Sequence, residues 1–324
     1  MSNINEFFGG EEVSKKYALM DFSQICLAAA MVVFPPGEKI SKTEMYNVVF
    51  NSLTQNIKRA KGDGFSEIVL TFDNAKYGYW RRIYADYYKR NRAIAREEAQ
   101  EKGTFDWEGY FEFLPEIIEG LKQSFPYILL NIKHCEADDC IAVMTKFLTN
   151  QGHHVRIVSS DGDFTQLHKF PNVDQWSPMQ KKFVQCKLES PLHDCMSKVI
   201  KGDKKDCVSS VKVRADFYLN HEQGERTPPT SSKVINAIVD IVKAVDNYDL
   251  DTFKPLIEQV FIDDMATKKK ITDVRPRLTE SMAISNPAIL DLDIEKTKKL
   301  IARLQTNRFM HNRVLIDFDY IPDD

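Results

Sequence analysis

Short apolar runs and longer amphipathic segments alternate along the first half of the chain. The apolar runs are rich in β-branched residues and are bounded by turn-forming residues, which is typical of buried strands. The expected strands cover residues 17–21, 67–73, 127–132 and 157–160. The segments between them have helical periodicity, at 22–33, 44–61, 107–125 and 136–150. This alternation predicts a largely parallel central sheet with helices on both faces.

The second half of the chain has a different pattern. Residues 173–176 and 182–187 read as a strand pair, and 191–200 as a helix. After a loop at 224–233 the chain is helical and charged, until a final apolar stretch at 313–320 that reads as a strand or buried segment. The domain organisation predicted from these patterns is a flexible N-terminal arm (1–16), an α/β domain (17–187) and a smaller, mainly helical C-terminal domain (188–324).

Composition narrows the class of protein. With 324 residues and 43% hydrophobic content the chain can build a sizeable core. Its formal net charge of -3, from 44 basic and 47 acidic residues, argues against a protein that coats DNA through a globally basic surface. Six scattered cysteines, with no secretory signal and no membrane-spanning run, predict reduced thiols, a cytoplasmic setting and no membrane contact.

Basic residues and aromatic rings are concentrated between Lys76 and Arg96. Seven lysines and arginines in this segment are opposed by a single acidic residue, and six aromatic rings lie among them. Arg82, Lys89 and Arg96 recur every seven residues, which predicts one basic face on a helix. Against a merely solvated helix with core aromatics, this mixture favours contact with single strands or backbone phosphates.

Acidic residues follow every expected strand of the first half. They are Asp21, Asp73, the Glu136–Asp139 cluster, and Asp161 with Asp163. Ligand sites in parallel sheets lie off the carboxyl ends of the strands. Gathered carboxylates raise one another's pKa unless a cation neutralises them, and their oxygens are the ligands that divalent cations prefer. Ordinary turn and helix-cap chemistry is the alternative for each acid taken singly.

A second acidic turn, Gly202-Asp203-Lys204-Lys205-Asp206, follows the helix expected at 191–200. A glycine turn with flanking lysines suits a helix-turn-helix element that grips a phosphate backbone through main-chain N–H groups. A plain solvated turn is the alternative.

These motifs, taken in order, resemble those of the flap-endonuclease-like 5′ nuclease family. The resemblance is carried by Leu19–Ser23, Thr71–Asp73, Glu136–Asp139, Ser159–Phe164 and Gly202–Asp206. It implies a PIN/5′ nuclease-like fold with a helical arch near 76–104 and a helix-three-turn-helix in the C-terminal domain. It also implies a metal-dependent phosphodiesterase, with 5′ to 3′ exonuclease and flap endonuclease activity, that removes RNA primers and adjacent DNA during lagging-strand replication.

The same resemblance implies roles for individual residues. Two Mg²⁺ ions, for which Mn²⁺ can substitute, would be held by Asp21, Asp73, Glu136, Asp138, Asp161, Asp163, Asp203 and Asp206. Catalysis would depend on Lys89, Asp138 and Asp161. Nucleic acid would be contacted by Arg81, Arg82, Tyr88, Lys89, Arg92, Arg96, Lys204 and Lys205, with Tyr88 as a stacking platform for a base. One departure is Cys207, where the family usually has asparagine.

The implied partners are branched or 5′-flapped DNA and RNA–DNA duplex. A sliding clamp or a single-strand-binding protein is a further expected partner, and Phe7 and Phe8 in the N-terminal arm are a candidate clamp peptide. The expected location is the cytoplasm of a phage-infected host cell. Two alternatives stay open: a replication factor that binds branched DNA without cutting it, and a PIN-type ribonuclease.

Overall fold

The chain folds into two compact units in the computed structural model, which describes residues 14–74, 76, 78–222, 224–245, 249–286, 288 and 291–322. The first unit comprises Met1–Tyr77 and Gly103–Gln185, and the second comprises Gly78–Lys102 and Cys186–Asp324. The segment that contains the predicted arch thus groups with the C-terminal residues. The candidate clamp peptide around Phe7 and Phe8 lies outside the described residues.

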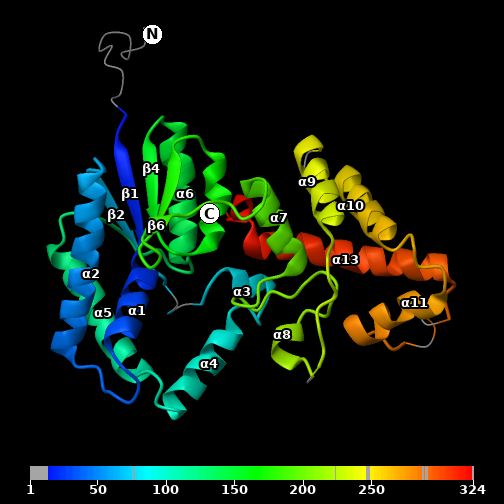
Figure 1. Cartoon of the computed structure of the whole chain (residues 1–324), viewed down its shortest axis with the longest axis horizontal. Coiled ribbons are helices and arrows are strands. Elements are labelled where there is room, and N and C mark those ends of the chain that lie inside the picture. The colour runs from blue at the N-terminus through cyan, green and yellow to red at the C-terminus, as the bar shows by residue number, and fades with distance from the viewer. Residues whose placement is uncertain are drawn as a thin grey trace, which may run out of the picture. The chain divides into compact units, whose positions relative to one another are not determined.

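A six-stranded sheet forms the centre of the first unit (Figure 1). Its strands are β1 (Lys16–Asp21), β2 (Glu67–Thr71), β3 (Ile128–Leu130), β4 (His154–Val158), β5 (Val173–Ser177) and β6 (Lys182–Phe183), in the order β3-β2-β1-β4-β5-β6. All neighbours are parallel except β5 and β6, which are antiparallel. The prediction of a largely parallel sheet is confirmed.

Helices cover both faces of this sheet (Figure 1). The helices of the first unit are α1 (Phe22–Val33), α2 (Lys42–Gly62), α5 (Trp107–Ser124) and α6 (Ala137–Asn150). Ala18 and Met20 of β1 are buried in one cluster with residues of α1, α2 and α5. Leu19 lies between them in the sequence and is also fully buried, so it faces the opposite side, where α6 contacts β1, β2 and β4.

The order of the strands brings the acidic segments to one edge of the sheet. β1 lies between β2 and β4, and Asp21 pairs with Thr71 while Met20 pairs with Val158. The carboxyl ends of these three strands are therefore level with one another. Asp21, Asp73 and the turn that contains Asp161 all leave the sheet at this edge.

The second unit is mainly helical, as predicted for the C-terminal region. Its helices are α3 (Arg81–Tyr84), α4 (Arg90–Glu101), α7 (Pro191–Lys201), α8 (Phe217–Asn220), α9 (Ser232–Ala244), α10 (Leu250–Asp264), α11 (Ile271–Pro276) and α13 (Ile294–Ile316). A π-helical turn (Arg277–Ser281) follows α11, and a 3-10 turn (Phe318–Tyr320) follows α13. Apolar residues of α7, α9, α10 and α13 form one core, which also takes in Ala85 and Tyr88.

The prediction of a basic face on one helix across Arg82, Lys89 and Arg96 is wrong. The segment is broken into α3 and α4 by residues 85–89, in which Ala85 is extended and Lys89 has a left-handed backbone with φ 56°. Its N–H donates to the carbonyl of Asp206 at 3.0 Å. Seven-residue spacing across such a break no longer places side chains on a common face.

The apolar stretch at 313–320 is buried in part, as predicted, but it is not a strand. It forms the last turn of α13 and the following 3-10 turn. Arg313 pairs with Asp317 four residues later, at 2.8 Å, and both side chains are buried. This helical pair and the inward packing of Leu315 and Ile316 override the strand preference of the β-branched residues.

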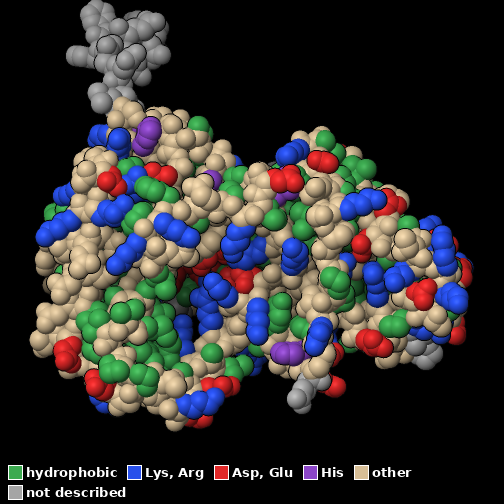
Figure 2. Space-filling view, viewed as in Figure 1, with side chains coloured by type: hydrophobic (Ala, Val, Ile, Leu, Met, Phe, Trp, Pro, Cys, Tyr) green, Lys and Arg blue, Asp and Glu red, His purple; other side chains and the backbone are tan. Residues whose placement is uncertain are grey.

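An apolar patch interrupts the charged surface of the first unit. Figure 2 shows hydrophobic side chains gathered over the lower ends of α1 and α5. Met31, Val32 and Val33 at the end of α1 are 52%, 84% and 53% exposed.

Within the described part of the chain, no helix combines the length and apolar character needed to cross a membrane.

Candidate active site

Asp21 is a buried strand-end acid of the first unit. As the last residue of β1 it caps α1, because its side chain accepts the Gln24 N–H at 3.0 Å. The Ser159 hydroxyl donates to its other oxygen at 3.0 Å. Burial, followed by the negative charge of Asp73, raises the pKa of Asp21 to about 7, with Asp161 adding to the rise. Three of the predicted ligands therefore share one electrostatic environment.

Asp73 connects the end of β2 to the start of α6. Its carboxylate accepts the Ala137 N–H at 2.9 Å, and its own N–H donates to the Ser23 hydroxyl at 3.1 Å. Glu136 and Asp139 form a reciprocal capping box at the same helix terminus, in which the Glu136 N–H donates to Asp139 at 3.0 Å. Asp73 and Glu136 are thus brought together through the first turn of α6.

The first turn of α6 also separates two neighbouring acids. Asp139 is almost completely buried and serves the capping box, whereas Asp138 is only half-buried. Within one helix turn, the Asp139 carboxylate therefore has a structural role, and the Asp138 carboxylate is accessible for chemistry.

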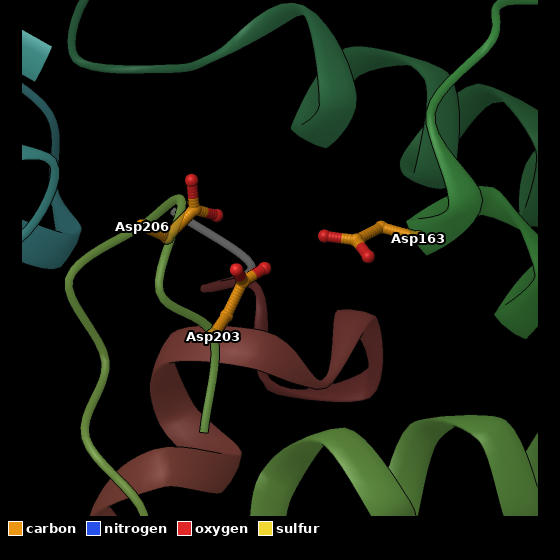
Figure 3. A group of neighbouring side chains, drawn as sticks. All are labelled: Asp163, Asp203 and Asp206. Atoms are coloured by element: carbon orange, nitrogen blue, oxygen red, sulfur yellow. The ribbon is translucent and has the colours of Figure 1, made fainter. Parts of the chain in front are cut away.

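Hydrogen bonds from the sheet hold the turn that carries Asp161 and Asp163. Asp161 caps the 3-10 helix Gly162–Lys169 and accepts the Asp163 N–H at 3.2 Å. The Gln175 amide on β5 donates to the carbonyls of Ser159 and Asp161, at 2.9 and 2.6 Å. Both carboxylates remain half-buried, with Asp163 drawn in Figure 3.

Two of these supporting residues were not identified as site residues from the sequence. Ser159 binds the Asp21 carboxylate, and Gln175 binds two carbonyls of the acidic turn. Gln175 is only 1% exposed. A long polar side chain in the middle of a predicted strand is the signal that could have identified it.

The acidic turn of the second unit is closed like a small hairpin. Asp203 and Val208 exchange two backbone hydrogen bonds, at 2.7 and 2.9 Å. Gly202 has φ +79°, and a Cβ there would lie 2.3 Å from the Val208 carbonyl oxygen, so the turn requires glycine. Asp203 and Asp206 each offer a carboxylate oxygen within 4.8 Å of the other, and Figure 3 shows both side chains on the turn.

Cations of the arch segment surround Asp206 within the second unit. Arg92 contacts its Oδ1 at 2.6 Å, and the Lys89 ammonium lies 3.9 Å from the same oxygen. Burial acts to raise the pKa of Asp206, but Lys89 and Arg92, helped by Lys198 and Arg81, outweigh it and the pKa is lowered. The neighbouring Asp203 pairs with Lys198 at 2.5 Å.

Cys207, the departure from the family pattern, lies buried behind this turn. Its side chain is turned away from solvent at 1% residue exposure, and the backbone N–H of Asn91 donates to its sulfur. Burial raises the pKa of this thiol, which keeps it neutral and unsuited to a hard divalent cation. Its φ of 61° explains the usual asparagine, since asparagine tolerates a left-handed backbone better than most residues.

The predicted nucleic-acid contacts differ in their exposure. Arg81 is 2% exposed and donates from Nε to the Leu315 carbonyl at 2.9 Å. Tyr88 is 3% exposed and packs in the core of the second unit. The expectation that these two side chains are displayed to nucleic acid is therefore corrected: they anchor the base of the arch segment. Lys204 and Lys205 are exposed, as expected.

Two further predicted contacts, Arg82 and Arg96, lie along the arch segment. Arg82 is exposed and Arg96 is half-buried. In Figure 2, basic side chains gather over α3 and the start of α4. These residues are available for contact with a phosphate backbone.

The acids of both units fit divalent cations. All are carboxylates, which are hard oxygen ligands suited to Mg²⁺. The raised pKa of Asp21 results from burial among like charges, a cost that a bound cation would offset. Asp203 and Asp206 supply a second close pair of oxygens.

Asp21 should make the stability of the protein fall with rising pH in a chelating buffer. The folded protein keeps the Asp21 proton up to a pKa of about 7, whereas the unfolded chain loses it near the ordinary value of 3.8. The folded state binds more protons in this window, so the free energy of unfolding should fall by up to about 4 kcal/mol between these two pKa values. Denaturant unfolding with EDTA at several pH values measures the slope. Asp21→Asn should flatten it, and an unchanged slope would contradict the assignment.

Comparisons with known proteins extend over nearly the whole chain. The model of the 5′-3′ exonuclease N-terminal resolvase-like domain matches residues 19–190. The model of the T4 RNase H C-terminal domain matches residues 189–252 and 264–324. Ribonuclease H of Enterobacteria phage T4 is 43% identical over 314 residues, which are 97% of this chain and 85% of that protein. The thermostable DNA polymerase I of Thermus thermophilus is 28% identical over 131 residues, 40% of this chain and 14% of the polymerase.

Solved structures have the same fold. The T5 D15 protein, co-crystallised with metal ions, superimposes with a TM-score of 0.54 at 15% identity, covering 94% of this chain and 90% of that one. The bacteriophage T5 D15 flap endonuclease in a pseudo-enzyme-product complex with DNA and metal ions gives 0.54 at 16% identity, covering 94% and 89%. The expected membership of the 5′ nuclease family is confirmed. The chain belongs to the 5′-3′ exonuclease family, with a C-terminal domain of the T4 RNase H type.

Proposed function

We propose that this 5′ nuclease uses two Mg²⁺ ions to hydrolyse phosphodiester bonds at 5′ ends and 5′ flaps, and so removes RNA primers and adjacent DNA during lagging-strand replication. The observation that carries the proposal is the set of acids at the ends of β1, β2 and β4, where crowding and burial raise the pKa of Asp21 to about 7. The T4 relative named a ribonuclease H and the T5 structure with DNA and metal ions support it.

The ligands are assigned by unit. In the first unit the ligands to one ion would be Asp21, Asp73, Glu136, Asp138 and Asp161. In the second unit the ligands to the other ion would be Asp203 and Asp206, and Asp163 stays a predicted ligand from the resemblance alone. When bound, such cations activate water as a nucleophile near neutral pH and stabilise the charge on the attacking and leaving oxygens at phosphorus. The protein's own part is to hold the carboxylates, through Ser159, Gln175 and the first turn of α6.

Lys89 would supply a fixed positive charge beside the reacting phosphate. It lies next to Asp206, and its side chain is only 8% exposed, so its charge acts in a medium that screens it weakly. Exposed and half-buried cations would hold the backbone of the 5′-flapped or branched substrate: Arg82, Arg96, Lys204 and Lys205. Such phosphate contacts make affinity fall with salt.

The protein's surroundings are proposed on the same basis. Six free cysteines and the T4 relative support action in the cytoplasm of a phage-infected cell. A sliding clamp or single-strand-binding protein stays a predicted partner. The C-terminal match to T4 RNase H favours this function over a PIN-type ribonuclease.

A cleavage assay tests the proposal. The full-length protein with Mg²⁺ should cut a 5′-flapped duplex near the junction, leaving a 5′-phosphate, and EDTA should abolish the cutting. RNA and DNA versions of the 5′ strand, compared at equal concentration, measure the preference for primers. Binding of the flapped duplex without cleavage under Mg²⁺ or Mn²⁺ would instead support the non-catalytic replication factor.

A further inference from the structure

The first turn of α4 is fastened to the acidic turn of the second unit. The Asn91 side chain donates to the Lys204 carbonyl at 2.7 Å, and Arg92 Nε donates to the Lys205 carbonyl at 3.3 Å. With the bond from the Lys89 N–H to the Asp206 carbonyl, three residues of the arch segment are tied to three consecutive residues of the acidic turn. These contacts fix where the Arg92 guanidinium lies.

Arg92 and Arg90 are near neighbours with different surroundings. Arg92 reaches Asp206 Oδ1 at 2.6 Å, and its side chain is 39% exposed while that of Asp206 is 14% exposed. Arg90 is exposed, and among the residues that the structure describes it has no acidic partner. Only one of these two arginines is bound to a predicted metal ligand.

We infer that Arg92 is a built-in counter-ion of Asp206 that competes with a divalent cation for this carboxylate. The inference rests on the proposed function, since it takes Asp206 as a metal ligand. An ion pair and metal coordination draw on the same negative charge, and a guanidinium at 2.6 Å opposes the approach of a divalent cation. The lowered pKa of Asp206 agrees with this, because Arg92 stabilises its charged form.

The competition couples the arch segment to the metal. By thermodynamic linkage, if a bound cation weakens the Arg92–Asp206 ion pair, the ion pair weakens the binding of that cation by the same free energy. Asn91 and the Lys89 N–H bind backbone carbonyls rather than the carboxylate, so they keep the two segments joined when the ion pair loosens. The ion pair then sets how strongly Asp206 attracts a divalent ion while the turn stays in place.

The test is a titration of the full chain with Mn²⁺ alone, without DNA, in which electron paramagnetic resonance measures the binding of Mn²⁺. Arg92→Gln should tighten the weaker Mn²⁺ binding step about fivefold, the value expected for a partly exposed ion pair. Arg92→Lys keeps the charge and should stay within about twofold of the unaltered protein. Arg90→Gln is the matched control, because it removes the same charge from the same helix turn without touching Asp206, and it should leave the binding unchanged.

The outcomes separate this inference from the proposed function. Asp206→Asn should weaken the same binding step; if it does not, Asp206 is not a ligand, and both that assignment and the inference fail. If Asp206→Asn weakens binding but Arg92→Gln leaves it unchanged or weaker, the proposed ligand stands and the counter-ion role is overturned. Should Arg92→Gln unfold the protein, Arg92→Met takes its place, after circular dichroism has verified that this variant is folded. The same tightening of Mn²⁺ binding is expected.

Discussion

Replacing Asp161 and Asp163 by asparagine should abolish cleavage of a 5′-flapped duplex and leave DNA binding close to its normal strength. Asparagine keeps the shape of each side chain but not the charge that would hold the metal ions. Asp161 also caps its 3-10 helix by accepting the Asp163 N–H, and an amide oxygen can still accept that bond. The turn should therefore persist while the single-turnover rate falls by about 1000-fold or more.

The measurement compares single-turnover cleavage with fluorescence anisotropy of a labelled flap substrate. Glu112→Gln with Glu119→Gln is the matched control, because these exposed acids of α5 remove the same charge from the same unit. The control should cut normally. Cleavage by the Asp161→Asn, Asp163→Asn protein at more than about a tenth of the normal rate would remove these residues from the metal site.

Most of the first unit could be predicted because its determinants are local. Short β-branched apolar runs and helical periodicity identified the strands and helices of the sheet domain, and parallel topology then required the strand-end acids to meet at one edge. Asp21 and Asp73 were found in this way, and the register of β1 with β2 and β4 agrees with it. The capping box of Glu136 and Asp139 likewise depends on a three-residue spacing.

What could not be predicted depends on partners far away in the sequence. The break between α3 and α4 ends at Lys89, whose N–H binds the Asp206 carbonyl, and no local pattern of charges records that bond. The burial of Arg81 has the same origin, because its partner is the Leu315 carbonyl. Gln175 holds the acidic turn from a strand that follows it. Sequence patterns thus identified chemical groups better than they identified what each group touches.

Lys89 is where this distinction matters most for catalysis. Lys89→Ala should slow the single-turnover rate by about 100- to 1000-fold, the usual loss when one fixed charge that stabilises a transition state is removed. Substrate affinity should change by less than about threefold, since the side chain is only 8% exposed and lies against Asp206. The backbone should tolerate the change, because the left-handed φ of 56° already has an energetic cost with lysine, and alanine would have a similar cost.

Single-turnover rates at saturating Mg²⁺, with Arg90→Ala as the matched control, decide what Lys89 does. If Lys89 were only a second counter-ion to Asp206, removing it would tighten metal binding and leave the rate at saturating metal unchanged. If it were a phosphate anchor, affinity and rate would fall together. A catalytic cation is the one role in which the rate falls at saturating metal and saturating substrate while both bind at least nearly as well as before. The contact at 3.9 Å from Asp206 Oδ1 is compatible with that role, because it keeps the ammonium beside the proposed metal ligand without fixing it there by a short hydrogen bond.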